Sequence, residues 1–85
     1  MAYAIEYTPA ADRQLRDLPR RVQEQIVGRI QALAEEPRPP GCKKLKGVDD
    51  QWRIRSGNYR IIYTVYDDRL VVLILKIADR KDVYG

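Results

Sequence analysis

The second half of the chain alternates between short strand-forming runs and turn residues, and this pattern restricts the fold more than any other feature. Residues 52–55 alternate apolar and basic side chains, as a strand with one solvated face does. Residues 59–66 are rich in β-branched and aromatic residues, and residues 70–77 are almost entirely apolar. Turn residues at 56–58 and 67–68 separate these runs. We therefore predict three consecutive antiparallel strands.

The loops between these strands predict a register. We expect a four-residue loop at 56–59 and a two-residue loop at 67–68. Directly opposed residues of an antiparallel pair point to the same face of the sheet. The expected pairs are Trp52 with Tyr63, Ile54 with Ile61, Ile61 with Ile74, Tyr63 with Val72, and Val65 with Leu70. All of these residues then share one apolar face.

Two amphipathic segments in the first half are suited to cover that face. Residues 3–7 alternate like a short strand, and Thr8 followed by Pro9 is typical of a helix start. This helix should end near Leu18, because the next residue is a proline. A second helix is expected over residues 20–36, where apolar residues recur at helical spacing. These are Val22, Ile26, Ile30 and Leu33.

The expected fold is a single α+β domain over residues 1–85. It has two layers, with an N-terminal strand and a helical hairpin packed on a mostly antiparallel sheet of about four strands. We see no signal peptide, and the longest apolar run, residues 70–75, is too short to cross a bilayer, so we expect a cytoplasmic protein without membrane contact. Cys42 is the one cysteine and there is no histidine, which excludes an internal disulfide and a zinc site.

The net charge of +4 comes from one quarter of the chain. Residues 1–40 carry six basic and six acidic side chains, and residues 61–85 carry four of each. Residues 41–60 carry six basic and two acidic ones. This concentration suits a polyanion such as nucleic acid, and it suits equally a solvated surface that keeps the protein soluble. The six basic residues are Lys43, Lys44, Lys46, Arg53, Arg55 and Arg60.

Two arginines of this segment should meet on the face away from the helices. The predicted register puts Arg55 directly opposite Arg60, and like charges so placed are destabilising, which favours a functional role. A three-residue loop without a bulge would instead put Arg60 on the other face. Arg60 should also lie opposite Leu75, near the end of the last strand. The tail that follows, with Arg80 and Tyr84, would then emerge beside the arginine pair.

Arg53, Arg55, Arg60 and Arg80 would together form a phosphate receptor, because guanidinium groups bind phosphate oxygens bidentately. Cleavage of RNA without a metal can use the ribose 2′-OH as nucleophile. It needs a proton acceptor, cations that stabilise the phosphorane, and a proton donor for the leaving oxygen. Arginine is a poor acceptor, and histidine is absent. Tyr84 is the remaining titratable candidate, and it could equally stack on a base.

The runs LKG, WRIRSGNYRIIYTV and DRKDVYG, preceded by a strand and two helices, resemble the RelE toxins of bacterial toxin–antitoxin pairs over nearly the full length. The resemblance implies a ribosome-dependent endoribonuclease that needs no metal or other cofactor, cuts mRNA in the ribosomal A site and thereby inhibits translation. By position, the catalytic residues of the family fall on Arg53, Arg55, Arg60, Arg80 and Tyr84. RNA or ribosome binding is assigned to Lys43, Lys44 and Lys46.

The resemblance also implies a partner, because each such toxin is held inactive by a cognate antitoxin protein encoded beside it. Every position of Leu70–Leu75 is apolar, whereas two helices can cover only one face of a sheet. Val71 and Leu73 therefore need other cover. We expect the tail to supply some of it and an antitoxin segment, folding upon the toxin, to supply the rest.

One departure from the family pattern leaves the proton acceptor unassigned. The best-known members have lysine where this chain has Arg53 and Arg55, and a lysine there is given the proton-accepting role. Three other functions therefore stay open. They are inhibition of DNA gyrase, as in the related ParE branch, binding of RNA or the ribosome without catalysis, and binding of a protein partner alone. The arginine pair and the tail argue against the ParE branch.

Overall fold

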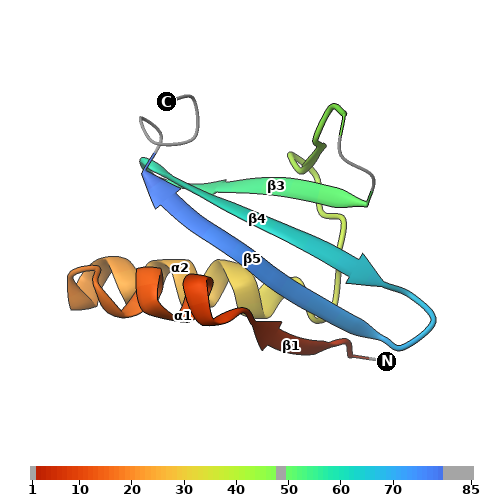
Figure 1. Ribbon diagram of the computed structural model, residues 1–85, viewed down its shortest axis with the longest axis horizontal. Coiled ribbons are helices and arrows are strands. Elements are labelled where there is room, and N and C mark those ends of the chain that lie inside the picture. Colours follow the sequence, from red (N-terminus) through yellow and green to blue (C-terminus); the bar gives the residue numbers. More distant parts are fainter. Residues whose placement is uncertain (1, 48–49, 80–85) are drawn as a thin grey trace.

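The computed structural model describes residues 2–47 and 50–79. Two helices lie against one face of a five-stranded sheet (Figure 1), which confirms the predicted two-layer α+β architecture. The elements are β1 Ala4–Tyr7, α1 Pro9–Arg16, α2 Arg20–Ala32, β2 Lys43–Lys44, β3 Gln51–Ser56, β4 Tyr59–Tyr66 and β5 Val71–Asp79. The strand order is β1-β5-β4-β3-β2, with β1 parallel to β5 and the other neighbours antiparallel. The short β2 is the strand that our estimate of about four omitted.

The first helix begins where the sequence predicts it. The hydroxyl oxygen of Thr8 accepts a hydrogen bond from the backbone N–H of Ala11 at 3.1 Å, and Pro9 occupies the first helical position. The same hydroxyl donates to the backbone carbonyl of Leu75 at 3.1 Å. One threonine side chain therefore caps α1 and attaches its start to β5.

The second helix ends at Ala32, four residues before the expected end at Glu36. The last turn tightens, because the N–H of Leu33 bonds to the carbonyl of Ile30, three residues earlier, as in a 3₁₀ turn. The carbonyl of Ala34 then accepts a hydrogen bond of 2.7 Å from the N–H of Tyr3. This hydrogen bond attaches the chain start to the segment that follows α2.

The core lies between the helices and the sheet. The buried apolar residues are Ala11 and Leu15 of α1, Ile26 and Ile30 of α2, Leu33, and Ile54, Ile61, Tyr63, Val65, Val72, Ile74 and Ile77 of the sheet. The stripe predicted for α2 is confirmed, with Val22 at its half-buried end. Of the eight residues expected on the apolar face, six are buried in the core and Trp52 is half-buried. Leu70 was wrongly included, because it lies in a turn.

The register between β3 and β4 is the predicted one. Ile54 pairs with Ile61, and Arg55 pairs with Arg60. The loop itself is shorter than expected, because Ser56 and Tyr59 pair with each other and leave two residues between the strands. Gly57 is the first of these two, and its φ of +59° is a conformation that glycine adopts without strain, as in a type II′ turn.

The register between β4 and β5 differs from the prediction. The turn spans four residues, 67–70, and not two, so Val65 pairs with Val72 and Tyr63 with Ile74. The N–H of Arg69 closes the turn by bonding to the carbonyl of Tyr66. A register error of two residues leaves each side chain on the same face, because the side-chain period of a strand is two. The apolar face was therefore predicted correctly from wrong pairs.

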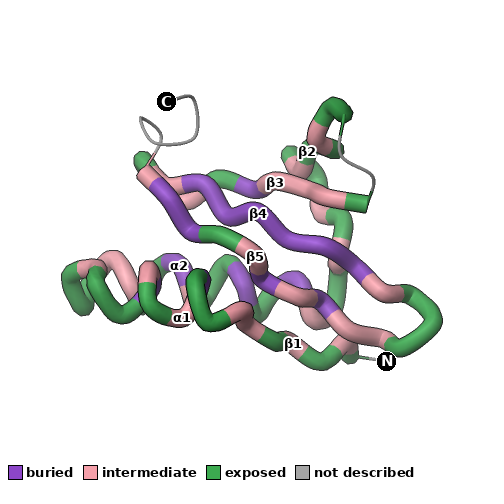
Figure 2. Tube along the Cα trace, in the orientation of Figure 1, coloured by how far each residue is buried: buried purple, intermediate pink, exposed green. Residues whose placement is uncertain are grey.

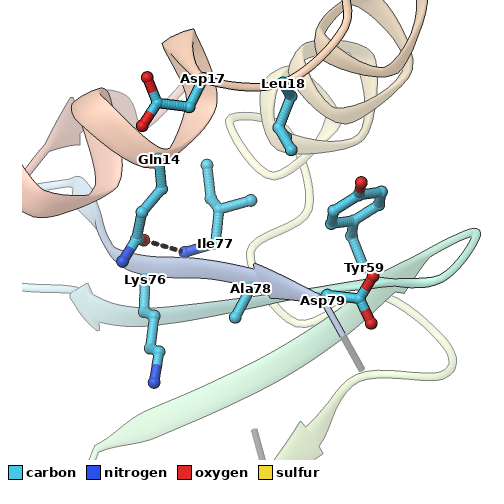
Figure 3. Close-up of a pocket in the computed structure, with 8 residues that line it drawn as sticks. All are labelled: Gln14, Asp17, Leu18, Tyr59, Lys76, Ile77, Ala78 and Asp79. Atoms are coloured by element: carbon cyan, nitrogen blue, oxygen red, sulfur yellow. Dashed lines mark hydrogen bonds between the residues drawn. The ribbon is translucent and has the colours of Figure 1, made fainter. Parts of the chain in front are cut away.

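A β-bulge interrupts the same pair of strands between Ile62 and Tyr63. Beyond it, Ile62 pairs with Lys76 and Arg60 pairs with Ala78, so the expected pairing of Arg60 with Leu75 is wrong. Leu75 is the additional residue. The N–H of Ile77 donates to the side-chain oxygen of Gln14 at 2.7 Å, as Figure 3 shows. Helix α1 and its cap thus satisfy two backbone groups of β5, one at the bulge and one two residues beyond it.

A polar cluster ties the chain start to the turn at 67–70. Asp67 accepts hydrogen bonds from the Tyr3 hydroxyl at 2.8 Å and from the Arg38 guanidinium at 2.9 and 3.3 Å. The hydrogen bond from Arg38, more than that from Tyr3, lowers the pKa of the Asp67 carboxyl. Arg38 also lies over the ring of Trp52, 5.3 Å from its centroid.

Neither described helix is long and apolar enough to cross a membrane.

Replacing Ile61 with alanine should lower the free energy of unfolding by about 2–5 kcal/mol, because this fully buried side chain touches both layers. Urea denaturation followed by circular dichroism would measure the change. Replacing the exposed Gln25 of α2 with alanine is the matched control and should change stability by less than about 0.5 kcal/mol. Equal effects of the two substitutions would contradict the assignment of the core.

Candidate nucleic-acid interface

The sheet face away from the helices, here called the outer face, is divided into a basic end and an apolar end. The register assigns residues to it, since opposed residues share a face. The basic end consists of Lys43 of β2, Arg53 and Arg55 of β3, Arg60 of β4 and Lys76 of β5. Four strands thus contribute cations to one end of one face. The prediction that Arg55 and Arg60 oppose each other on this face is confirmed.

The two opposed arginines differ in exposure. Arg60 is only 3% exposed. Its strand, β4, lies between β5 and β3 and is buried along most of its length (Figure 2). Arg55 is exposed, and its backbone carbonyl accepts a hydrogen bond of 3.2 Å from Nε of Arg29 on α2. A helix side chain thus holds the end of β3 in place. Arg29 is itself exposed, so its position on the helix would not by itself reveal this contact.

One donor of the Arg53 guanidinium lacks a partner within the described part of the chain. Its Nε is shielded from solvent and has no hydrogen-bond partner in the structure. Buried donors are rarely left in this state, and an anion is one group that would satisfy it. Within the described part of the chain, no carboxylate forms an ion pair with Lys43, Arg53, Arg55 or Lys76. These cations therefore remain available to phosphate groups.

The apolar end of the outer face follows β5 toward the turn at 67–70. Val71, Leu73 and Leu75 are each half-buried, and Tyr66 opposite Val71 is half-buried as well. The guanidinium of Arg69 lies 4.2 Å from the centre of the Tyr66 ring. As the sequence predicts, the helices do not cover these side chains, which form an apolar surface beside the basic end.

The other predicted site residues are distributed more widely. Lys43 pairs with Arg53 on the outer face, whereas Lys44 pairs with Trp52 and belongs to the opposite face. Lys46 is exposed in the turn after β2. Arg80 and Tyr84 lie outside the described residues. Lys76 is a residue of the basic end that sequence reasoning missed, because only the bulge turns it to this face.

A hollow of about 350 Å³ lies between the end of α1 and the sheet, where β4 begins and β5 ends (Figure 3). It is lined by Gln14 of α1, Asp17, Leu18, Tyr59 of β4 and residues 76–79 of β5. Tyr59 points toward Leu18, so it is a core-facing aromatic and not part of the outer face. Among the described residues, no group of three or more His, Cys, Asp or Glu side chains could hold a metal ion.

Comparisons with known proteins identify the family. The family model described as the ParE toxin of the type II toxin–antitoxin system parDE matches residues 5–84. The mRNA interferase toxin RelE of Escherichia coli K12 is 33% identical over 89 residues, which cover 100% of this chain and 93% of that protein. The chain belongs to the RelE family of toxins. This agrees with the predicted resemblance, and ParE toxins form the related branch of the same superfamily.

Other relatives of this RelE-family chain give the same result. Toxin RelG of Mycobacterium tuberculosis is 31% identical over 85 residues, which cover 99% of this chain and 98% of RelG. The crystal structure of the toxin–antitoxin complex RelBE2 from the same organism superimposes with a TM-score of 0.84 at 29% identity, covering 94% of this chain and 93% of that one. The intact E. coli RelBE complex gives 0.81 at 31% identity, covering 92% and 96%.

Replacing Arg55 with glutamine should weaken binding of single-stranded RNA about tenfold, because one phosphate contact is lost. The plot of log affinity against log salt concentration should become shallower by about 0.7. A 2′-O-methylated oligonucleotide, which cannot be cleaved through its 2′-OH, permits the measurement by fluorescence anisotropy. Arg20→Gln, on the exposed side of α2, is the matched control and should leave both quantities unchanged. Identical salt slopes for the two variants would contradict an RNA-binding role of Arg55.

Proposed function

We propose that this chain is the toxin of a toxin–antitoxin pair and a ribosome-dependent endoribonuclease that cleaves mRNA in the ribosomal A site. Cleavage there would inhibit translation in the cytoplasm. The observation that carries this proposal is the opposition of Arg55 and Arg60 on an outer face that also holds Arg53. A sheet built for stability alone gains nothing from two facing guanidinium groups. The mRNA interferase activity named for the E. coli relative supports the same class of reaction.

The arrangement of cations fits metal-independent cleavage through the ribose 2′-OH. Attack of the 2′ oxygen on the adjacent phosphorus builds negative charge on the phosphorane, and guanidinium groups around it stabilise that charge. Arg60 is held by a buried strand, so its position is preorganised, whereas Arg55 is exposed and accessible to the RNA backbone. In this proposal Arg53, Arg55, Arg60 and Arg80 bind and stabilise the reacting phosphate. Tyr84 stacks on a base or transfers a proton.

The lysines near β2 have a supporting role in this proposal. Lys43 extends the basic end to the edge of the sheet, and Lys46 is exposed in the adjoining turn. Lys44 is also exposed, although it lies on the other face. Together they would hold ribosomal or messenger RNA around the sheet edge by contacts with phosphate groups, which give affinity without sequence preference.

Inhibition of DNA gyrase is the second candidate function, because the matching family model is described as a ParE toxin. The two activities need different surfaces. An arginine cluster that surrounds a phosphate is required for cleavage of RNA, whereas binding of gyrase has no need of it. The basic end of the outer face therefore favours the nuclease.

Primer extension on a defined mRNA held in a programmed ribosome would test this function. The wild-type protein should cut within the A-site codon. Arg55→Ala and Arg60→Ala should each slow the cut by about a hundredfold or more, since each removes a group that stabilises the transition state. Because Arg60 is buried, circular dichroism must first show that its variant folds.

Arg13→Ala, an exposed position of α1, is the matched control and should cut at the wild-type rate. Intact message at a saturating concentration of wild-type protein would exclude the nuclease. Loss of gyrase supercoiling activity in a parallel assay would then assign the chain to the ParE mode of action.

The partner in this proposal is a cognate antitoxin. Two of the solved relatives are toxin–antitoxin complexes that superimpose on this chain over more than nine-tenths of its length. The apolar end of the outer face, with Val71, Leu73 and Leu75 half-buried, offers the antitoxin an apolar surface beside the basic end. An antitoxin segment that covers both ends would hide the arginines from RNA, and in this way it would inhibit the toxin.

Leu73→Asp should weaken binding of the antitoxin encoded by the adjacent gene by about 10- to 100-fold, the loss expected when one buried leucine contact is replaced by a charge. Isothermal titration of the two purified proteins would measure it. Leu73→Met keeps an apolar side chain of similar volume and should bind within about threefold of wild type. Equal affinities for the two variants would place the antitoxin on another surface.

A further inference from the structure

The proposed nuclease lacks a proton acceptor among its arginines. Arg53 and Arg55 stay protonated at any relevant pH, and the chain contains no histidine. An acceptor must therefore be a lysine amine, a carboxylate or a phenol within reach of the basic end. The register of the sheet shows which described side chains satisfy this condition.

Lys76 reaches the basic end because of the β-bulge. If the strands stayed in register beyond Tyr63, Leu75 would lie opposite Ile62, and Lys76 would point into the core opposite Ile61. The additional residue moves the pairing by one, so Lys76 lies opposite Ile62 on the outer face. In Figure 3 its side chain extends to the opposite side of β5 from Ile77, and it is exposed. Bulges commonly redirect one side chain next to an active site.

The position of Lys76 relative to the arginines is suitable for proton transfer. Arg60 pairs with Ala78, two residues beyond Lys76, so Lys76 and Arg60 are diagonal neighbours. Such positions are about 7–8 Å apart between Cα atoms, which long side chains bridge easily. Ala78 is small, and beyond Tyr7 the parallel strand β1 no longer accompanies β5. The described elements therefore leave the lysine side chain free to approach a phosphate held by Arg60 and Arg55.

The other candidates on the outer face are less suitable. Glu6 pairs with Leu73 of β5, which pairs in turn with Thr64, four residues along β4 from Arg60. Lys43 pairs with Arg53 from the two-residue edge strand β2, which is two strands away from β4, the strand of Arg60. Tyr66 is near the far end of β4 and lies under the Arg69 guanidinium. Among the described lysine, carboxylate and phenol side chains of the outer face, Lys76 is the one adjacent to Arg60.

We propose that Lys76 is the general base of this ribonuclease, an inference that rests on the proposed function. In its unprotonated form the amine takes the proton of the 2′-OH. The 2′ oxygen then bonds to phosphorus, the bond from phosphorus to the 5′ oxygen breaks, and that oxygen takes a proton from water. The products are a 2′,3′-cyclic phosphate and a 5′-OH end, with no change in oxidation state. The arginines stabilise the charge, and the lysine moves the proton.

Single-turnover cleavage of an mRNA in programmed ribosomes, measured across pH, tests this role. The variants are Lys76→Arg, which keeps the charge, and Lys76→Ala, which removes it. Both should lower the cleavage rate by about 10²- to 10⁴-fold, the usual contribution of a general base, while Lys76→Arg binds the ribosome within about twofold of wild type. The wild-type rate should depend on pH, and both variants should lose this dependence.

Chemical rescue separates a proton acceptor from a simple cation. Methylamine should restore part of the activity of Lys76→Ala, and guanidine at the same concentration should not. Lys43→Ala is the matched lysine control, and it should bind more weakly yet keep the wild-type dependence of the rate on pH. Lys76 is exposed, so the substitutions should leave the fold intact, which thermal unfolding verifies.

Each other outcome is decisive. Cleavage by Lys76→Arg at the wild-type rate, or an unchanged pH profile, would overturn the base role while leaving the nuclease in place. A wild-type protein that does not cut mRNA would instead overturn the proposed function, and the inference about Lys76 with it.

Discussion

The burial of β4 is the constraint on which the rest of the structure depends. Six consecutive residues of this strand, Arg60–Val65, are buried, although alternate ones point to opposite faces. The helix side is covered by α1 and α2, and β3 and β5 flank the strand on both edges. A guanidinium at one of these positions is energetically costly unless hydrogen-bonding groups or an anion surround it. Its presence there is better explained by function than by stability.

The first helix has two separate effects on the site. Its cap, Thr8, and its side chain Gln14 bond to the backbone around the bulge of β5, at Leu75 and Ile77. These hydrogen bonds satisfy backbone groups of β5 at the bulge and beside it, where β1 no longer accompanies the strand. The helix layer thus contacts the segment whose bulge brings Lys76 beside Arg60. The helices do more than cover the core.

The substitution of lysine by arginine on β3 has a consequence for the whole basic end. Arginine side chains at positions 53 and 55 are suited to bind phosphate at least as well as lysine, because their planar donors can form paired hydrogen bonds. They cannot exchange a proton near neutral pH. If the activity is that of the RelE relatives, proton transfer has moved to another strand. Lys76 of β5 lies on the same face as Arg60 and diagonally beside it, because the bulge shifts the pairing by one residue.

The sequence by itself determined the layers of the fold and one face of the site. The alternation of residues 52–66 set the strands, their apolar face and the opposition of Arg55 and Arg60, because these depend on local period and on one tight turn. Helix starts were also predictable from Thr8 and Pro9. Three features could be seen only in the tertiary structure. They are the end of α2, the pairing of β4 with β5, and the place of Lys76. Each is decided by contacts across the layers, between Tyr3 and Ala34 or between α1 and β5, which leave no periodic trace in the sequence.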